Sequence, residues 1–279
     1  MRFISFTVLG MSLIAGLSLP EPASACGPDS DCMIGERHYR IRMPDGHDGR
    51  TPVGAIIYAH GYKGSAKGAM RNEAMSNAVS DLGLAFVAVK SASDDWHIPN
   101  APSQHPPEDL VELEYFDALV DDLKARFNID PAKLMVTGFS AGGMMTWTLA
   151  CERAEKFAGF APISGTFWDP HPKDCPSDPA HIIHFHGTAD PVVPLKGRKI
   201  GPTHQGNIFN VLTMYADDGG YDGLQTSKPL NLSCERRTNP TGKILEFCLH
   251  DGGHQFRTDY IVWAFKELQA LGAFEGATN

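Results

Sequence analysis

The chain has 279 residues, of which 42% are hydrophobic, and its 33 acidic and 24 basic side chains give a formal net charge of −9. This acidic balance, without a basic cluster, argues against nucleic acid or an anionic membrane surface as a partner. The length is sufficient to bury a full core in one domain, and no internal repeat or Ser/Thr/Pro-rich linker divides the sequence.

The first 25 residues have the pattern of a cleavable export signal. Arg2 precedes an apolar stretch over residues 3–19, and Ala23–Ser24–Ala25 is a small-x-small site for signal peptidase. Glycine and serine residues interrupt the stretch and no second one follows, so we expect no retained membrane span. We predict a signal peptide at 1–25 and a single catalytic domain at 26–279, secreted or periplasmic. Cleavage would leave Cys26 first, so a lipid anchor on this cysteine is the less favoured alternative.

The six cysteines of an exported chain fit three disulfides, although six thiols allow fifteen pairings. Cys26 and Cys32 bracket a Gly–Pro–Asp turn, and Cys234 and Cys248 flank a predicted hairpin over 239–242. These two pairs leave Cys151 and Cys175 as the third. No Cys-x-x-Cys spacing occurs, which argues against a zinc-ribbon or thioredoxin-like role. The expected disulfides are Cys26–Cys32, Cys151–Cys175 and Cys234–Cys248.

Short apolar runs alternate with longer periodic segments along the chain. Residues 108–127 carry apolar side chains at spacings of three and four, which predicts an amphipathic helix, and 66–81 and 260–271 are predicted as further helices. Alternating strands and helices favour an α/β architecture with a largely parallel sheet, helices on both faces and functional groups at the carboxyl ends of the strands. The predicted buried strands are Val53–Ala59, Leu84–Val89, Leu134–Thr137, Phe157–Ile163 and His181–Phe185.

One serine lies where a predicted strand must turn directly into a helix. The pattern is Gly138-x-Ser140-x-Gly142, with a strand over 134–137 before it and a helix over 141–150 after it. Glycines on both sides allow strand and helix to approach closely, so the serine stands alone at the tip of a strained turn. This context predicts a nucleophile elbow, with the first N–H groups of the helix directed at the serine.

Other chemically active residues follow the remaining predicted strands. The turn His60–Gly61–Tyr62–Lys63–Gly64–Ser65 can supply a second oxyanion donor, and we expect this to be the N–H of Tyr62, beside the N–H of Ala141. Asp190 follows the strand at 181–185, and His254 lies in a glycine-rich loop before the last helix. The order Ser140, Asp190, His254 is the order of nucleophile, acid and base in α/β-hydrolases.

These motifs together resemble the secreted polyhydroxybutyrate depolymerase and feruloyl esterase family of α/β-hydrolases, over about residues 37–271. The resemblance is carried by His60–Gly61, by the elbow, by 186–194 and by Gly253–His254. It implies an α/β-hydrolase fold and a serine carboxylic-ester hydrolase. Two departures bear on the substrate: Asp217–Asp218–Gly219–Gly220 replaces a Trp-containing segment of many relatives, and no substrate-binding module follows the catalytic domain.

Each assignment at the site has a rival in the sequence. His250 is the alternative to His254 as base, and Asp169, in the loop after the preceding strand, is the alternative to Asp190 as acid. His181, His184 and His186 do not share one face of a strand, so we expect packing and hydrogen bonding there rather than metal binding. His60, Trp96 and Trp168 lie at strand ends and could line a substrate pocket or cap the core.

The sequence therefore predicts an exported serine ester hydrolase that needs no metal or cofactor. The expected substrates are short-chain esters, above all hydroxyalkanoate oligomers or related polyester and phenolic esters. A feruloyl or acetyl-xylan type of carbohydrate esterase is the alternative, and a serine peptidase on the same fold is less favoured because no gating domain is present. The oligomeric state is left open.

Overall fold

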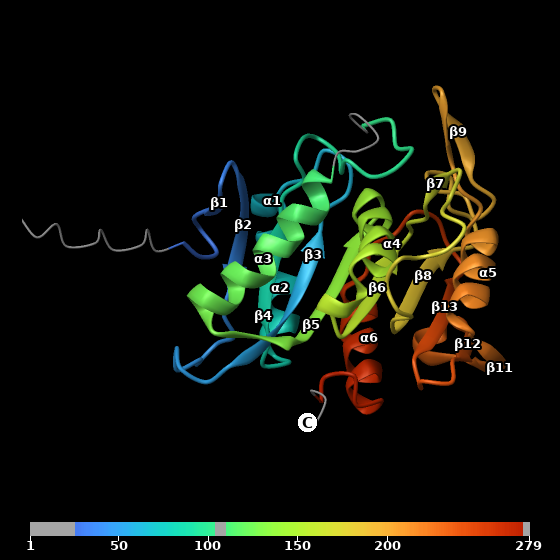
Figure 1. The fold of residues 1–279 in the computed structure, drawn as a ribbon. Helices are drawn as coiled ribbons and strands as arrows, with labels where there is room; N and C mark the ends of the chain where they lie inside the picture. The colour runs from blue at the N-terminus through green and yellow to red at the C-terminus, as the bar shows by residue number, and fades with distance from the viewer. Residues whose placement is uncertain (1–25, 104–109, 276–279) are drawn as a thin grey trace, which may run out of the picture.

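A long twisted sheet forms the centre of the computed structural model, which describes residues 26–103 and 110–275 (Figure 1). Within these residues the sheet has ten strands in the order β1-β2-β4-β3-β5-β6-β8-β13-β12-β11. The strands are β1 (Cys32–Ile34), β2 (Arg37–Arg42), β3 (Val53–Ala59), β4 (Ala85–Val89), β5 (Ile129–Phe139), β6 (Gly159–Ile163), β8 (Ile182–Gly187), β11 (Asp222–Ser227), β12 (Ser233–Thr238) and β13 (Ile244–His250).

The central part of this sheet is parallel. Neighbouring strands from β4 through β13 pair in parallel, whereas β1, β2, β12 and β11 extend the two edges with antiparallel pairs. The centre consists of apolar runs such as β3 and β4, which bury side chains on both faces, as parallel strands under helices do. The expected α/β-hydrolase fold is confirmed, with a mostly parallel sheet between layers of helices.

Helices cover both faces and divide the core into two layers (Figure 1). One layer packs α3, α4 and α5 against side chains such as Ile57 and Val87, and the other packs α1, α2 and α6 against side chains such as Ile56 and Phe86. Alternate residues of β3 and β4 thus contribute to opposite layers. The helices are α1 (Ala66–Met70), α2 (Glu73–Ser80), α3 (Val111–Phe127), α4 (Ala141–Glu152), α5 (Ile208–Gly219) and α6 (Thr258–Ala270), with short 3-10 turns at Ala154–Lys156 and Pro229–Asn231.

The helices depart from the sequence prediction at two places. The single helix expected over 66–81 is wrong, because Asn72 interrupts it and its side chain accepts the N–H of Met75 as the cap of a second helix. The sequence analysis does not predict α5, although Asn207 caps its start and Gly220, whose φ of 65° suits a glycine, caps its end. The first predicted residues of α3, 108 and 109, lie outside the described part, as does the predicted signal peptide at 1–25.

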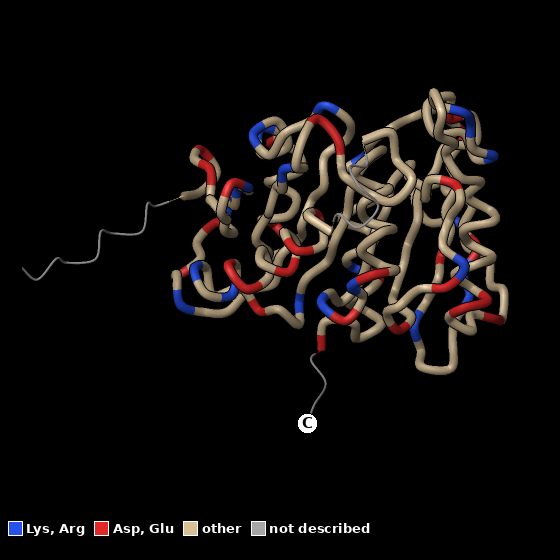
Figure 2. The backbone as a smooth tube through the Cα atoms, turned by 45° about the horizontal axis from the view of Figure 1, so that its top comes forward, with Lys and Arg blue, Asp and Glu red and all other residues tan. Residues whose placement is uncertain are grey.

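A small antiparallel sheet projects beside the main one. It consists of β7 (Trp168–Asp169), β10 (Thr203–Gln205) and β9 (Arg198–Ile200). Acidic and basic residues mix along most outer segments in Figure 2, but Lys196, Arg198 and Lys199 are exposed together around β9. None of the helices in the described residues is long and apolar enough to cross a membrane.

All six cysteines are paired in the described chain. The disulfides are Cys26–Cys32, Cys151–Cys175 and Cys234–Cys248. The last one joins directly opposed residues of β12 and β13. The second joins the end of α4, the helix that follows Ser140, to the loop before β8.

Gly142 allows β3 and α4 to meet behind Ser140. A Cβ atom at this position would lie 1.9 Å from the carbonyl oxygen of Ala59 and 2.5 Å from its carbonyl carbon. Both atoms belong to the backbone of β3, so the strand would have to move. The glycine is therefore required by the close approach of strand and helix.

We expect Gly142→Ala to lower the free energy of unfolding by on the order of 3 kcal/mol, because the added methyl group overpacks the backbone contact. Gly27→Ala is the control, since its nearest atom would be 3.9 Å away. Urea unfolding of the two variants measures the difference. Equal stabilities would show that β3 and α4 can separate without cost.

Candidate active site

Ser140 occupies a strained turn between β5 and α4. Its φ of 60° and ψ of −120° are unusual for a residue with a side chain. The turn is held on both sides, because the N–H of Ser140 donates to the carbonyl of Ile163 at 2.9 Å and its own carbonyl accepts the N–H of Met144 at 3.0 Å. The backbone is thus fixed by β6 and by the first turn of α4, and the serine takes the place that the sequence predicts for a nucleophile.

His254 and Asp190 form a short hydrogen bond. The Nδ1 atom of His254 lies 2.7 Å from Oδ2 of Asp190, whose side chain is fully buried. A carboxylate only accepts, so Nδ1 carries the proton and Nε2 keeps a free lone pair. The ring of Phe139, the residue before Ser140, lies 4.5 Å from the imidazole ring between centroids. This contact places the imidazole beside Phe139 at the end of β5, the residue that precedes Ser140.

Asp190 is held in its charged form. Burial alone would raise the pKa of its carboxyl group, but hydrogen bonds outweigh this effect and the pKa is lowered. The donors are His254 to Oδ2 and the N–H groups of Val193 and Val192 to Oδ1, at 2.9 and 2.8 Å. An ionised carboxylate is thus present to orient and stabilise the imidazole.

The loops that carry these two residues are bonded to each other. The N–H of Thr188 donates to the carbonyl of His250, and the N–H of Ala189 donates to the carbonyl of Gly252. Gly187 allows this approach, since a Cβ there would lie 2.3 Å from the carbonyl oxygen of Gly253. Because β8 and β13 are neighbours in the sheet, their loops emerge side by side and the contact follows directly.

Two backbone N–H groups are available near Ser140. Ala141 opens α4, and the first N–H groups of a helix have no acceptor inside it. Tyr62 lies in a turn closed by the Gly64 N–H on Gly61, and within the described residues no acceptor is bound to the Tyr62 N–H. A Cβ on Gly61 would lie 3.5 Å from Cβ of Ser140, so this turn borders the serine.

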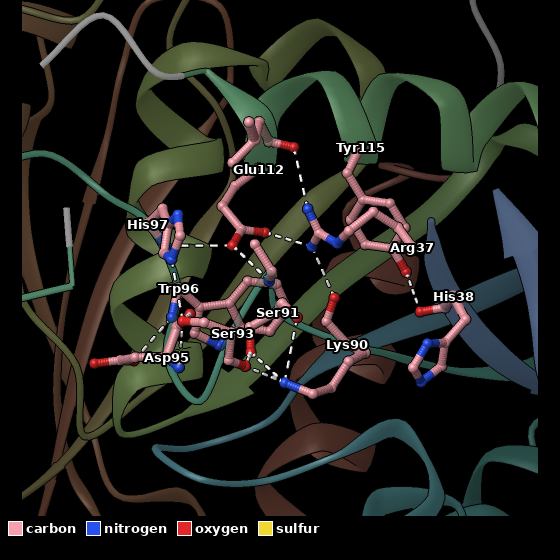
Figure 3. A network of polar contacts seen from close by, with 12 residues as sticks. Arg37, His38, Lys90, Ser91, Ser93, Asp95, Trp96, His97, Glu112 and Tyr115 are labelled. Atoms are coloured by element: carbon pink, nitrogen blue, oxygen red, sulfur yellow. Dashed lines mark hydrogen bonds and ion pairs between the residues drawn. The ribbon is translucent and has the colours of Figure 1, made fainter. Parts of the chain in front are cut away.

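A buried carboxylate, that of Glu112, holds the loop after β4, which is bonded to this turn (Figure 3). Glu112, 1% exposed, pairs with Arg37 at 2.7 Å and accepts the N–H groups of Ala92 and His97. The loop after β4 is thereby fixed, and its Asp94 carbonyl accepts the N–H of Lys63 at 2.7 Å.

The sequence did not single out Glu112 or Arg37 as functional. The available signal was the position of Glu112 four residues before Phe116, on the apolar stripe of α3. A charged residue there must be paired once the stripe is buried.

Asp169 and His250, the alternative acid and base, contact other residues. Asp169 faces His171 at 3.4 Å and His204 at 3.2 Å, on the small sheet. His250 packs its ring 5.9 Å from that of Tyr260, and burial lowers its pKa. The structure thus brings Asp190 together with His254 and places Asp169 with other histidines.

The three residues considered as a pocket lining are buried. His60, Trp96 and Trp168 are 3%, 1% and 6% exposed. The indole N–H of Trp96 donates to the carbonyl of His60, and burial lowers the pKa of His60 to about 4, so its ring is neutral and bonded to Ser91. Because they are buried, these side chains offer little surface to a substrate, which favours the core-capping interpretation over the pocket lining.

Candidate metal ligands gather at one place in the described part of the chain. Donor atoms of Cys234, Glu246 and Cys248 lie close together, but the two sulfurs are joined in a disulfide and offer no thiolate. His184 and His186 bond to each other, as expected from their shared strand face, and His181 bonds to the N–H of Ile244.

Comparison with known proteins gives one clear family. Residues 30–197 match the family model described as "Putative esterase". The chain belongs to this esterase family. It is 29% identical over 229 residues to feruloyl esterase C of Emericella nidulans, covering 79% of this chain and 77% of that one, and 26% identical over 243 residues to "Putative esterase NocK" of Nocardia uniformis, covering 78% and 70%.

Solved structures agree on the fold. An acetyl xylan esterase from Aspergillus awamori superimposes with a TM-score of 0.60 at 16% identity, covering 83% of this chain and 94% of that one. The protein described here is thus a carboxylic ester hydrolase on an α/β-hydrolase fold.

Glu112→Gln should lower the free energy of unfolding by about 3 kcal/mol. Arg37 loses its buried counter-charge, and an amide NH₂ group, which only donates, replaces a carboxylate oxygen that accepts hydrogen bonds. Glu114→Gln is the matched control, since Glu114 is exposed on the same turn of α3 and should change stability by less than ~0.5 kcal/mol. Urea unfolding measures both. Similar small losses would show that the buried pair contributes nothing to the loop.

Proposed function

We propose that Ser140, His254 and Asp190 are the nucleophile, base and acid of a serine ester hydrolase, with the N–H groups of Tyr62 and Ala141 as oxyanion hole. The hydrogen bond from His254 to the buried Asp190 carries the proposal, because it orients an imidazole beside the strained turn at Ser140. A serine hydroxyl is a weak nucleophile at neutral pH and needs such a base.

The chemistry follows from these positions. Nε2 of His254 takes the proton of the Ser140 hydroxyl as its oxygen attacks the ester carbonyl, and the Tyr62 and Ala141 N–H groups stabilise the oxyanion. His254 then gives the proton to the leaving alcohol, which leaves an acyl-serine. Water, deprotonated by the same imidazole, attacks the acyl group, and the imidazolium gives this proton to the Ser140 oxygen as the bond to the acyl group breaks and the acid is released. Asp190 stays ionised and stabilises the imidazolium in both steps.

The substrate class is proposed from the relatives and the sequence motifs. Several relatives are named feruloyl esterases, which favours esters of phenolic acids, including those carried on carbohydrate. Hydroxyalkanoate oligomers are the second candidate, favoured by the likeness to polyhydroxybutyrate depolymerases in the motifs around Ser140 and Asp190. A peptidase activity is less favoured, and comparison of matched ester and amide substrates separates it.

Export of this enzyme is part of the proposal. Three disulfides join the cysteines of the described chain, and such bonds persist in oxidising compartments. With the signal pattern at residues 1–25, this supports a secreted or periplasmic enzyme with one catalytic domain at 26–279. The disulfide at Cys26 supports a protein thiol partner for this residue over a lipid anchor.

Substitution of the proposed catalytic residues tests the mechanism. Ser140→Ala should lower kcat by on the order of 10⁴-fold or more on a p-nitrophenyl ester, since nucleophile and base act as one unit. Asp190→Asn should lower kcat by about 10⁴-fold, because an amide favours the wrong imidazole tautomer.

Asp169→Asn is the matched control and should leave kcat nearly unchanged. Circular dichroism confirms the fold of each variant. A Ser140→Ala enzyme with a few per cent of normal activity, or a larger loss for Asp169→Asn than for Asp190→Asn, would contradict the assignment.

Acyl-chain length tests the substrate class. We expect the highest kcat/KM on acetyl to butyryl esters, on methyl ferulate or on soluble hydroxybutyrate oligomers, with no jump at micelle formation. Each buried methylene contributes roughly 0.8 kcal/mol, so a site that takes up only the first few methylenes gains nothing from longer chains. Rates that keep rising to C12 chains would indicate a deep acyl tunnel instead.

A further inference from the structure

A chain of hydrogen bonds crosses the core from α4 to the loop that holds Asp190. The indole N–H of Trp147 donates to Nδ1 of His184 at 3.0 Å, Nε2 of His184 lies 2.9 Å from Nδ1 of His186, and Nε2 of His186 lies 2.7 Å from the carbonyl oxygen of Val193. The side chains of Trp147, His184 and His186 are all 0% exposed. The mechanism proposed above does not use them.

The ends of this chain fix the position of every proton in it. An indole N–H can only donate, so Nδ1 of His184 accepts, and a carbonyl oxygen can only accept, so Nε2 of His186 donates. Burial lowers the pKa of both histidines, so each is neutral and carries one proton. Both therefore carry it on Nε2, and each donor in the chain meets one acceptor.

The last link meets the residue that holds the carboxylate. Val193 accepts the proton of His186 with its carbonyl and donates its own N–H to Oδ1 of Asp190. The Nε2 atom of His186 also lies 3.6 Å from Oδ2 of Asp190, the oxygen that binds His254. The donor end of His186 thus faces both the turn over 190–193 and the carboxylate itself.

We propose that His186 is a positioning residue for Asp190 and that Trp147 and His184 set the tautomer it needs. This proposal rests on the proposed function, because it assigns Asp190 to orient His254. If the Val193 carbonyl lost the hydrogen bond from His186, the turn over 190–193 would relax and the carboxylate oxygens of Asp190 would move. His184, His250, His254 and Asp190 are the titratable groups around His186.

Two polar substitutions separate this role from general packing. In His186→Gln the amide N–H reaches about the place of Nε2 and can still donate to Val193, whereas in His186→Asn the amide reaches only the place of Nδ1, toward His184. Misplacement of a catalytic group by about 1 Å can cost 10²-fold. We therefore expect kcat about 10 to 100-fold lower in His186→Asn and within about 3-fold of normal in His186→Gln, with KM little changed in both.

A spectroscopic readout that needs no substrate accompanies the kinetics. The Nδ1 proton of His254 gives a strongly downfield proton NMR signal when it is bonded to Asp190, and this signal should persist in His186→Gln and shift or vanish in His186→Asn. It separates a failure of this proposal from a wrong substrate class, because it is recorded on the free enzyme. His181→Asn and His181→Gln are the control pair, since His181 bonds to the Ile244 N–H instead, and they should not differ.

Equal kcat values and equal His254 signals in the two His186 variants would overturn the proposal. If neither variant folds, nitrogen-15 NMR of the unaltered enzyme decides the question. The proposal requires Nε2-protonated tautomers at both His184 and His186. A proton on Nδ1 of His186 would overturn it, because Nε2 could then not donate to Val193.

Discussion

The hydrogen bond between His254 and Asp190 is the contact on which the rest of the site depends. A buried carboxylate is costly unless its oxygens are satisfied, and Asp190 meets this requirement with His254 on one oxygen and the N–H groups of Val192 and Val193 on the other. Its lowered pKa shows that these bonds outweigh burial. The bond to His254 also fixes the imidazole, so the same contact stabilises the loop at Asp190 and orients the ring of His254.

The sheet makes this contact possible. Strands β8 and β13 are parallel neighbours, so the loops after them emerge at the same edge, and Gly187 lets their backbones join. The turn at Ser140 follows β5 in the same parallel set and is bonded to β6 through Ile163. Ser140, Asp190 and His254, the proposed nucleophile, acid and base, are far apart in sequence, yet each follows a strand that its neighbours hold in place.

Beyond these residues, buried polar groups hold the surrounding loops. Glu112 and Arg37 fix the segment after β4, which in turn is bonded to Lys63 beside Tyr62. On the other side, Trp147, His184 and His186 connect α4 with the Asp190 turn. Such groups are costly to leave unpaired in a core, so each network favours one arrangement of its loop.

The sequence by itself determined the parallel α/β architecture and the serine turn, because apolar runs, helical periodicity and glycine spacing are local signals. It also indicated Asp190 and His254 through their place after predicted strands, while Asp169 and His250 remained as rivals. Only the tertiary structure showed that Asp190 meets His254 and that Asp169 meets His171 and His204, since those contacts depend on strand order. The burial of Trp96 and the pairing of Glu112 were likewise decided by packing between distant segments.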